Sequence, residues 1–516
     1  MKIYKKIAVG LLSTIVVLIC LNFVLDIWIS AKLKSILTQK NTASFIVKYK
    51  NLDTSLFTNS ISVDEISFIP KENTSDSLAK TKISGTIKLV KVTHIGIFGI
   101  LFKDKITANN IIISNPKITF LTNKKPDKKE QDEAVKSLEK TFSISNIYLK
   151  NAEIKIINDV SKKVLLSVHN LNVSLDEIGL SDKTIAEKIP FSYKSYSVDC
   201  DSIFYHQNEF YNIKSNKITA SDSELKISDF KLIPLYSRKQ FASKIATEKD
   251  LYAISSKEIS VDKMKWGFKD TIFFFETQSV LLDKVSATIY RSKEPKDDLS
   301  KKKLYNNLLR NLKFNLKVDT LKVRNSTLIY EEEITFEKGP GKLYFDNFNL
   351  TATTIESGFK KTKLPDLKIK INCLFMKTSP LNVNWRLNVM DKTDGFRIQG
   401  NIANFDLEKL NPFTKPYINV KTKGIFNKVV FDFTGNDISS TGKFALEYDD
   451  LKVEIFKKDD RKKKNKLLTA IGNLFVKNDT KDKLKDTDVA VERIQEKSFY
   501  NFLWLNIAEG LKKLLI

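Results

Sequence analysis

The chain has 516 residues, of which 42% are hydrophobic, and it carries 86 Lys and Arg against 61 Asp and Glu, a formal net charge of +25. This length and hydrophobic content favour a folded body of two or three ordinary domains and exclude a disordered chain. Its lysine runs are scattered over predicted loops and lack interleaved aromatic residues. Most are therefore expected to be solvated surface, with contact to anionic lipid headgroups as the alternative.

The first predicted element is a membrane anchor within residues 1–40. Residues 7–25 are apolar apart from Ser13, Thr14 and Asn22, and a helix of this length nearly crosses a hydrocarbon core of about 30 Å. Three lysines precede the run, which favours a cytoplasmic N-terminus and a chain body outside the cytoplasm. A cleaved signal peptide is the alternative, but residues 29–31 make a poor cleavage site. The residues expected to contact the bilayer here are Leu11, Leu12, Val16, Leu18 and Trp28.

The following 400 or so residues, about 41–456, are predicted to be β structure. Short alternating runs such as Ile61-Ser62-Val63 and Leu225-Lys226-Ile227 are separated by Asn, Asp, Ser and Gly turns. Alternation of this kind is typical of strands with one apolar and one polar face. The fold class expected is mainly β: the transmembrane helix, then an elongated, twisted antiparallel sheet that forms a groove, with a few short helices.

Three strand-like segments share one phrase, an Asn followed by a small residue, at Asn115, Asn151 and Asn325. Apolar residues fall at minus four, minus two, plus three and plus five relative to the Asn. This spacing changes parity, so a regular strand would switch its apolar face at the Asn. One extra residue in a bulge restores the apolar stripe, and Asn tolerates the left-handed backbone that such a kink needs. The apolar residues of the phrase are Ile111, Ile113, Ile118, Phe120, Ile147, Leu149, Ile154, Ile156, Leu321, Val323, Leu328 and Tyr330.

Two helical insertions indicate an internal repeat. Residues 128–140 and 300–312 have helical spacing, the second with Ser300 as its N-cap. Each precedes a strand that carries the Asn phrase, and these two phrases lie 174 residues apart. We therefore expect two similar lobes joined end to end, the first over residues 41–298 and the second over 299–456.

The C-terminal part is predicted to be a charged, mobile segment, 457–497, followed by an amphipathic helix, 498–516. The helix either plugs one end of the sheet or lies at a membrane or partner surface. In the second interpretation, Phe499, Phe502 and Trp504 contact the membrane.

No motif typical of catalysis or metal binding is present in the sequence. The three histidines, His94, His169 and His206, stand alone in strand-like segments, whereas zinc and catalytic sites need clusters. Nucleophile-elbow, phosphate-loop and metalloprotease motifs are absent. We expect no enzyme activity, no metal and no cofactor. Cys200 and Cys373 either form one disulfide in an oxidising compartment or remain free thiols.

Several of these segments resemble the AsmA-like family of bacterial envelope proteins, within the wider group of repeating β-groove, bridge-like lipid transfer proteins. The resemblance covers most of the chain: the lysine-flanked anchor, residues 96–120 with their I-x-I-x-N-P-x-I-x-F ending, the other Asn phrases, and residues 225–234 and 497–504. It implies a single-pass inner-membrane protein with its bulk in the periplasm of a Gram-negative envelope. It also implies a groove that helps to move phospholipid toward the outer membrane or to maintain outer-membrane composition.

Together these observations predict a non-enzymatic lipid-binding protein whose groove, lined by the apolar residues of the Asn phrases, shields acyl chains. The expected partners are phospholipids or other acyl-chain lipids, the inner membrane, and an outer-membrane or envelope protein at the C-terminal end. Nucleic acid is not expected in that compartment. The alternative function is a scaffold or assembly factor for outer-membrane proteins, in which the sheet packs on itself. An enzyme of lipid metabolism would require a buried polar cluster, which the sequence does not indicate.

Overall fold

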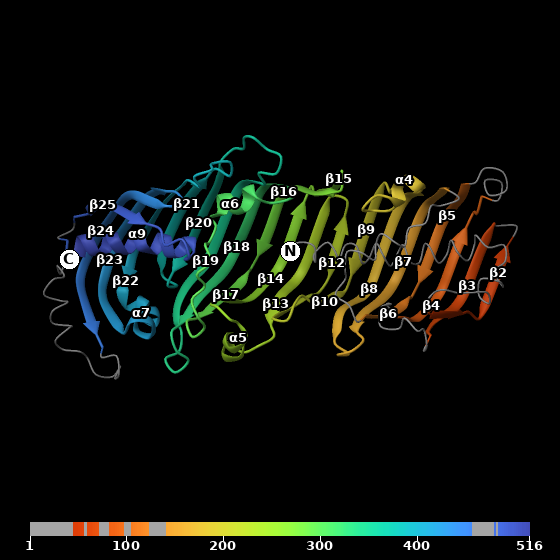
Figure 1. Ribbon diagram of the computed structural model, residues 1–516, viewed down its shortest axis with the longest axis horizontal. Helices are drawn as coiled ribbons and strands as arrows, with labels where there is room; N and C mark the ends of the chain where they lie inside the picture. The colour runs from red at the N-terminus through yellow and green to blue at the C-terminus, as the bar shows by residue number, and fades with distance from the viewer. Residues whose placement is uncertain are drawn as a thin grey trace. The chain divides into compact units, whose positions relative to one another are not determined.

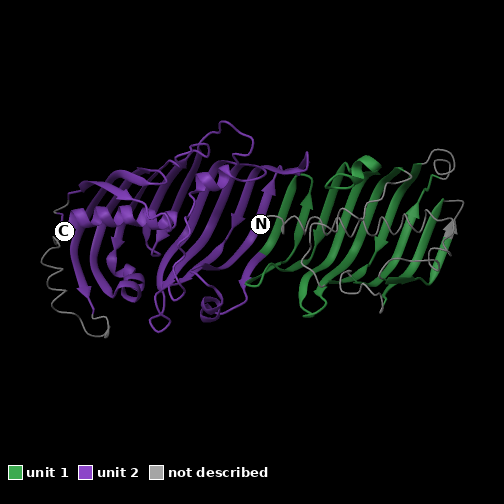
Figure 2. Cartoon of the chain, viewed as in Figure 1, with its two compact units in different colours: residues 1–229 green, residues 230–516 purple. Residues whose placement is uncertain are grey.

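The computed structural model describes residues 45–55, 59–71, 82–96, 105–122, 141–456, 479–480 and 483–515 (Figure 1). These residues are mainly β, with a large twisted mixed sheet and a few short helices, so the predicted β class is confirmed. The chain divides into two compact units after Asp229 (Figure 2), whereas the predicted boundary between the lobes lies near residue 298.

The predicted anchor, with Leu11, Leu12, Val16, Leu18 and Trp28, lies outside the described residues, as does the predicted helix at 128–140. Within the described ranges, no helix combines the length and apolar character needed to cross a bilayer.

The described residues of unit 1 form strands and one short helix, α4 (Asp182–Ile185). Its strands are β1 (Phe45–Lys48), β2 (Asn51–Ser55), β3 (Ser60–Pro70), β4 (Lys82–Thr93), β5 (Lys105–Ser114), β6 (Lys117–Thr122), β7 (Thr141–Asn158), β8 (Val164–Leu180), β9 (Ser195–Cys200), β10 (Ser202–His206), β11 (Tyr211–Ser215), β12 (Ile218–Ser221) and β13 (Glu224–Pro234), which extends past the division.

Unit 2 contains longer strands and most of the described helices. Its strands are β14 (Asp250–Asp262), β15 (Lys265–Lys269), β16 (Ile272–Asp283), β17 (Ser286–Ser292), β18 (Asn315–Glu333), β19 (Gly341–Glu356), β20 (Leu367–Phe375), β21 (Ser379–Leu387), β22 (Phe396–Asp406), β23 (Val420–Gly435), β24 (Ser439–Ile455) and β25 (Lys485–Glu492). Its helices are α5 (Arg238–Lys244), α6 (Tyr305–Arg310), η1 (Leu407–Leu410), α7 (Asn411–Ile418) and α9 (Phe499–Leu515).

The sheet is mixed, so the prediction of an antiparallel sheet was wrong in part. In unit 1, β5 and β6 both run parallel to β7. In unit 2, β16 and β17 both run parallel to β18. Parallel neighbours need a crossover connection, because the chain must return to the same end of the sheet. In unit 2 this connection is residues 293–314, which include α6.

The second helical insertion was predicted at the right place but too long. α6 begins after Leu304 and spans Tyr305–Arg310, so Ser300 is not its N-cap. The backbone N–H of Ser300 instead donates to Asp298 Oδ1 at 2.9 Å. This local side-chain turn competes with helix formation and moves the helix start toward Leu304.

The predicted kink is present at all three Asn phrases, as a break between β5 and β6 at Asn115 and as a bulge within β7 and β18. Asn115, Asn151 and Asn325 have left-handed backbones, with φ of 52°, 54° and 51°. The register between β7 and β8 shifts after Leu149, and the register between β18 and β19 shifts after Val323. Apolar residues on both sides of the bulge therefore share one face although their parity differs.

The small residue after each Asn also has a structural reason. Pro116, Ala152 and Ser326 are all buried, because the bulge turns the next side chain onto the packed face. In unit 2, Ser326 Oγ accepts the backbone N–H of Val285 at 2.9 Å.

The two units repeat the same bulge in detail. The Asn151 N–H donates to Asn172 Oδ1 at 2.9 Å, and the Asn325 N–H donates to Asn349 Oδ1 at 3.1 Å. Left-handed residues recur at equivalent positions of the next strand: Asn170 and Glu177 on β8, and Asn347 and Thr354 on β19. Each unit thus repeats one arrangement. Two shorter strands run parallel to a long strand, and the long strand then forms an antiparallel hairpin with the next strand.

The segment predicted to be charged and mobile, 457–497, contains strand β25. All eight of its residues pair antiparallel with β24, and Val489 is buried against the core. The alternation Val489-Ala490-Val491 is too short to stand out among the surrounding charges. The predicted C-terminal helix is confirmed as α9.

Asn151→Val is expected to lower the free energy of unfolding by about 1–2 kcal/mol, because a β-branched side chain clashes in the left-handed conformation. Asn151→Gly should change it far less, since glycine adopts this conformation without a clash. Urea denaturation followed by circular dichroism measures both. Equal midpoints for the two variants would show that the bulge does not depend on a left-handed residue.

Candidate functional site

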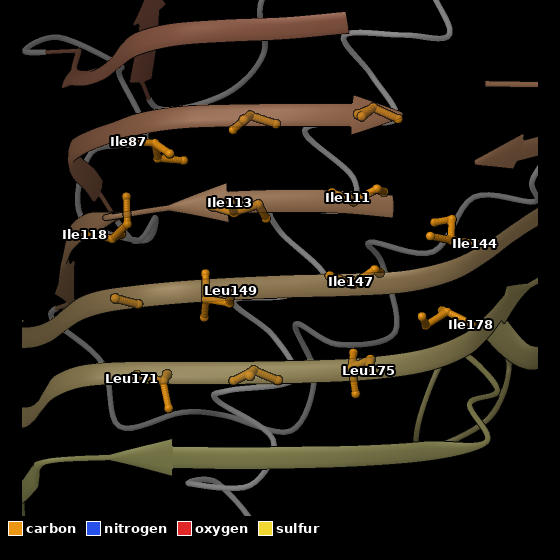
Figure 3. Packing of buried hydrophobic residues seen from close by; sticks show 14 of the residues in the cluster. Ile87, Ile111, Ile113, Ile118, Ile144, Ile147, Leu149, Leu171, Leu175 and Ile178 are labelled. Carbon is orange, nitrogen blue, oxygen red and sulfur yellow. The ribbon is translucent and has the colours of Figure 1, made fainter. Parts of the chain in front are cut away.

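The predicted groove residues of unit 1 form rows across neighbouring strands. Ile113 pairs with Leu149 and Ile111 with Ile147 on one side of the bulge. Ile118 pairs with Ile154 and Phe120 with Ile156 on the other side. Figure 3 shows Ile111, Ile113, Ile147 and Leu149 side by side. The row through Ile113 consists of Val63, Val90, Ile113, Leu149, Val173, Val198, Ala220 and Leu225.

Seven of these eight predicted residues are buried in unit 1. Their exposed fractions range from 1% for Ile113, Ile147 and Leu149 to 8% for Phe120, and Ile156 is half-buried. An acyl chain would reach them only by replacing protein contacts.

The corresponding surface of unit 2, here called the unit 2 face, is more exposed. It contains two rows, and its predicted residues Leu321, Val323, Leu328 and Tyr330 are all half-buried. The row through Val323 consists of Ile259, Leu282, Val323, Leu350, Ile371, Val383, Gly400, Phe431 and Phe444. The row through Leu321 consists of Val261, Val280, Leu321, Ala352, Ile369, Trp385, Ile398 and Phe433.

The exposure of the unit 2 face changes along the first row. From Ile259 to Val383, six consecutive aliphatic side chains are half-buried, whereas Phe431 and Phe444 are 4% and 0% exposed. The middle strands therefore present apolar surface that the protein does not cover completely.

Helix α9 covers the C-terminal end of the unit 2 face (Figure 1). Phe499 stacks on Trp385 with ring centroids 4.5 Å apart, and Phe502 meets Phe396 edge-on at 5.9 Å. Gly510 lies so close to Phe444 that a Cβ at this position would come within 2.4 Å of the Phe444 ring. The helix plugs this end of the sheet, which is one of its two predicted roles.

The three α9 residues predicted to contact a membrane have different environments. Phe499 and Phe502 are buried in the core of unit 2, at 6% and 1% exposed. Trp504 is 54% exposed on the outer side of the helix, one turn from Tyr500 at 63%. Of the three, only Trp504 is placed to contact another surface.

A charged network lies at one end of the unit 2 face, where β14 begins and β17 and β18 end. Polarity increases along the strands in successive rows. The first row is apolar, with Ile254, Ala287 and Leu328; the second contains tyrosines, with Tyr252, Ile289 and Tyr330; the third is ionic, with Asp250, Arg291 and Glu332.

Hydrogen bonds and ion pairs hold the ionic row in place. Arg291 Nε donates to Asp250 Oδ1 at 2.7 Å. Lys293 Nζ lies 2.9 Å from Glu248 Oε2 and 3.1 Å from Glu332 Oε1. Burial opposes the charge of Lys293, but Glu332 and Glu248 outweigh it and raise its pKa, so the side chain remains an ammonium group.

Two tyrosines complete the network around Glu332. The Tyr330 hydroxyl donates to Glu332 Oε2 at 2.7 Å, and the Tyr417 hydroxyl, from α7, donates to Oε1 at 3.1 Å. Burial raises the pKa of both hydroxyls, and the charge of Glu332 raises it further, so both stay protonated donors. Helix α7 is thereby fixed beside the ionic row.

The opposite face of the same strands carries a separate ion cluster. Glu331 and Glu333 are 3% and 4% exposed. Glu331 pairs with Arg238 of α5 and, at 3.0 Å, with Lys342. Glu333 accepts the Tyr290 hydroxyl at 2.5 Å. These contacts attach α5 to the sheet.

The sequence contains a signal for the ionic row that our prediction missed. Ile289, Arg291 and Lys293 share one parity on β17 and its continuation, and Leu328, Tyr330 and Glu332 share one parity on β18. Charged residues thus follow apolar ones on the same face at the ends of two strands. The predicted antiparallel arrangement could not place Arg291 beside Glu332, because parallel pairing aligns them.

His169 and His206 contact polar side chains of neighbouring sheet residues. His169 Nδ1 lies 2.7 Å from Glu153 Oε2 and its Nε2 lies 3.0 Å from Ser167 Oγ, and His206 Nδ1 lies 2.9 Å from Asn212 Oδ1. Cys200 and Cys373 are buried free thiols, and burial raises their pKa to about 11 and about 12. Within the described part of the chain, no three His, Cys, Asp or Glu side chains gather to hold a metal ion.

Comparison with known proteins gives no assignment of the site. No family model matches the chain. No curated protein is significantly similar to it in sequence. The AsmA-like resemblance therefore stays a prediction.

Phe502→Ala is expected to lower the free energy of unfolding by about 3–5 kcal/mol, because it leaves a cavity beneath α9. Trp504→Ala, on the same helix, should change it by no more than about 0.5 kcal/mol. Urea denaturation compares the two variants. A larger loss for Trp504→Ala would contradict the orientation of α9.

Cys200 and Cys373 are expected to resist thiol reagents in the folded protein. At about pH 8 a raised pKa leaves almost no thiolate, and burial blocks access. The third cysteine of the chain, Cys20, is replaced by serine for this test. In this Cys20→Ser background, colorimetric thiol titration should detect neither residue before denaturation and both afterwards. Rapid reaction of the folded protein would contradict the burial of these thiols.

Proposed function

We propose that the protein is a membrane-anchored, periplasmic lipid-binding protein that shields acyl chains along its sheet and assists phospholipid transfer between the inner and outer membranes. The observation that carries the proposal is the half-buried row from Ile259 to Val383. Six strands present aligned aliphatic side chains there, with no charge among them. Proteins seldom expose a contiguous apolar surface unless it binds something.

The dimensions of this row suit an acyl chain. Neighbouring strands lie about 4.8 Å apart, so six strands span about 24 Å, more than the roughly 15 Å depth of one hydrocarbon leaflet. Each methylene group transferred from water to such a surface contributes about 0.8 kcal/mol. Binding of this type needs no specific residue, which agrees with the degenerate aliphatic composition of the row.

Within each unit, the repeated bulges keep the apolar residues on one face, and this supports two lobes of similar construction. The predicted N-terminal anchor and the AsmA-like resemblance support an inner-membrane attachment, with the sheet on the periplasmic side.

A scaffold or assembly factor for outer-membrane proteins is the second candidate. Tyr500 and Trp504 support it, because α9 is rigidly packed and yet exposes two aromatic side chains at 63% and 54%. Exposed aromatic residues of this kind are typical of binding surfaces.

The lipid proposal is tested by photo-crosslinking from neighbouring positions of β18. A photoreactive amino acid at Val323 should capture phospholipid when the full chain is incubated with phospholipid vesicles. The same amino acid at Lys322, which points to the opposite face, should capture several-fold less. Mass spectrometry of the adducts measures both. Equal capture from the two positions, or none from Val323, would sink the proposal and favour the scaffold.

A further inference from the structure

The order of polarity on the unit 2 face matches the order of groups in a phospholipid. The apolar row at Leu328 is followed by the tyrosine row at Tyr330 and then by the ionic row at Arg291. Hydrocarbon chains, ester and glycerol oxygens, and a charged headgroup follow one another in the same order along a lipid molecule. An acyl chain that lies along the strands and crosses the apolar rows would bring its headgroup to the ionic row.

Arg291 is prepared for an oxygen anion. Asp250 fixes its Nε at 2.7 Å, and its terminal amino groups have no hydrogen-bond partner among the described residues. Its side chain is 25% exposed. A guanidinium group presents paired N–H donors whose geometry fits two oxygens of one phosphate.

Glu248 provides a complementary feature on the same network. It is 7% exposed, and its Oε1 is buried without a hydrogen-bond donor, although Oε2 is paired with Lys293. Asp297, which is paired with Lys497 at 3.1 Å, lies beside Glu248, so two carboxyl groups face each other. A pair of this kind favours a proton or a cation between its members.

The ionic row, together with Glu248 and Lys293 beside it, carries an excess of one negative charge. Glu248, Asp250 and Glu332 carry three, while Arg291 and Lys293 carry two. Glu248 and Lys293 lie two residues beyond Asp250 and Arg291, which is about 6.6 Å along a strand. The site thus offers a phosphate ligand and, a short distance away, an ammonium ligand.

We propose that this end of the unit 2 face binds the zwitterionic headgroup of an aminophospholipid, with the phosphate on Arg291 and the ammonium group on Glu248. The inference deepens the proposed function and rests on it. It assigns a headgroup preference to a surface whose apolar part has none.

The test measures lipid bound to the full chain by native mass spectrometry after incubation with vesicles of phosphatidylethanolamine and phosphatidylglycerol in equal parts. Wild type should be enriched in phosphatidylethanolamine. Arg291→Gln should lower total phospholipid occupancy on the order of tenfold, because a bidentate charged contact is lost. Binding of a free fatty acid, which has no phosphate, should be unchanged. Arg291→Lys should fall between the two.

The Glu248→Gln variant tests recognition of the ammonium group separately from recognition of the phosphate. It should abolish the preference for phosphatidylethanolamine over phosphatidylglycerol while leaving total phospholipid occupancy near that of wild type. A retained preference would mean that Glu248 shares a proton with Asp297 and binds no ammonium group, which overturns the proposed zwitterionic specificity.

Arg386→Gln is the matched control. Arg386 is a half-exposed arginine of unit 2, paired with Asp366 at 3.5 Å on the opposite face, and its replacement should alter neither occupancy nor preference. If Arg291→Gln alone does not fold, the double variant Arg291→Gln with Asp250→Asn removes both charges of the pair and should show the same loss.

The remaining outcomes distinguish this inference from the proposed function. Lipid bound equally by wild type and Arg291→Gln overturns the headgroup site alone. Lipid absent from wild type overturns the proposed function as well. Inorganic phosphate that displaces phospholipid at equal concentration identifies a site for free phosphate and overturns the lipid assignment.

Discussion

A β-strand alternates its side chains between two faces, so one added residue moves every later side chain to the other side of the sheet. The rest of this structure depends on that constraint. Strands such as β7, β8 and β18 are each sixteen or more residues long, and their apolar side chains must stay on one face over that length. A left-handed residue at Asn151, Asn170 or Asn325 supplies the compensating bulge each time. Because neighbouring strands bulge together, the rows on either side of the bulge stay aligned from strand to strand.

Much of this was accessible from the sequence, because parity is a local property. The offsets around Asn151 required a bulge, and the structure has one. The predicted pattern, Asn followed by a small residue, was too specific. Asn404 and Asp450 are also left-handed, and the residues that follow them, Phe405 and Leu451, are large and buried. A left-handed Asn or Asp before any inward-facing residue is the more general signature.

The sequence marks the charged strand ends of the ionic row, but it does not show that they meet. Glu248, Arg291 and Glu332 come from segments 40 or more residues apart, and each alone is an ordinary charge on a strand end. Their meeting depends on the parallel pairing of β17 with β18, which hydrophobic alternation cannot distinguish from antiparallel pairing. The orientation of α9 was left open for a similar reason. Apolar residues surround much of that helix, and only contacts such as Phe499 with Trp385 decide which side is packed.

The parallel pairing of β16 and β17 with β18 affects the order in which unit 2 folds. Hairpins such as β18–β19 and β23–β24 join segments adjacent in sequence, whereas β16 and β17 meet β18 only after the 293–314 crossover has closed. The loop must close, at a cost in entropy, before the contacts that stabilise the pairing can form. Non-local pairing therefore forms slowly. The hairpins on either side of the crossover can form first as independent nuclei. Joining them at Lys284 and Arg324, where the Lys284 N–H donates to the Arg324 carbonyl at 2.9 Å, would then be the slow kinetic phase of unit 2.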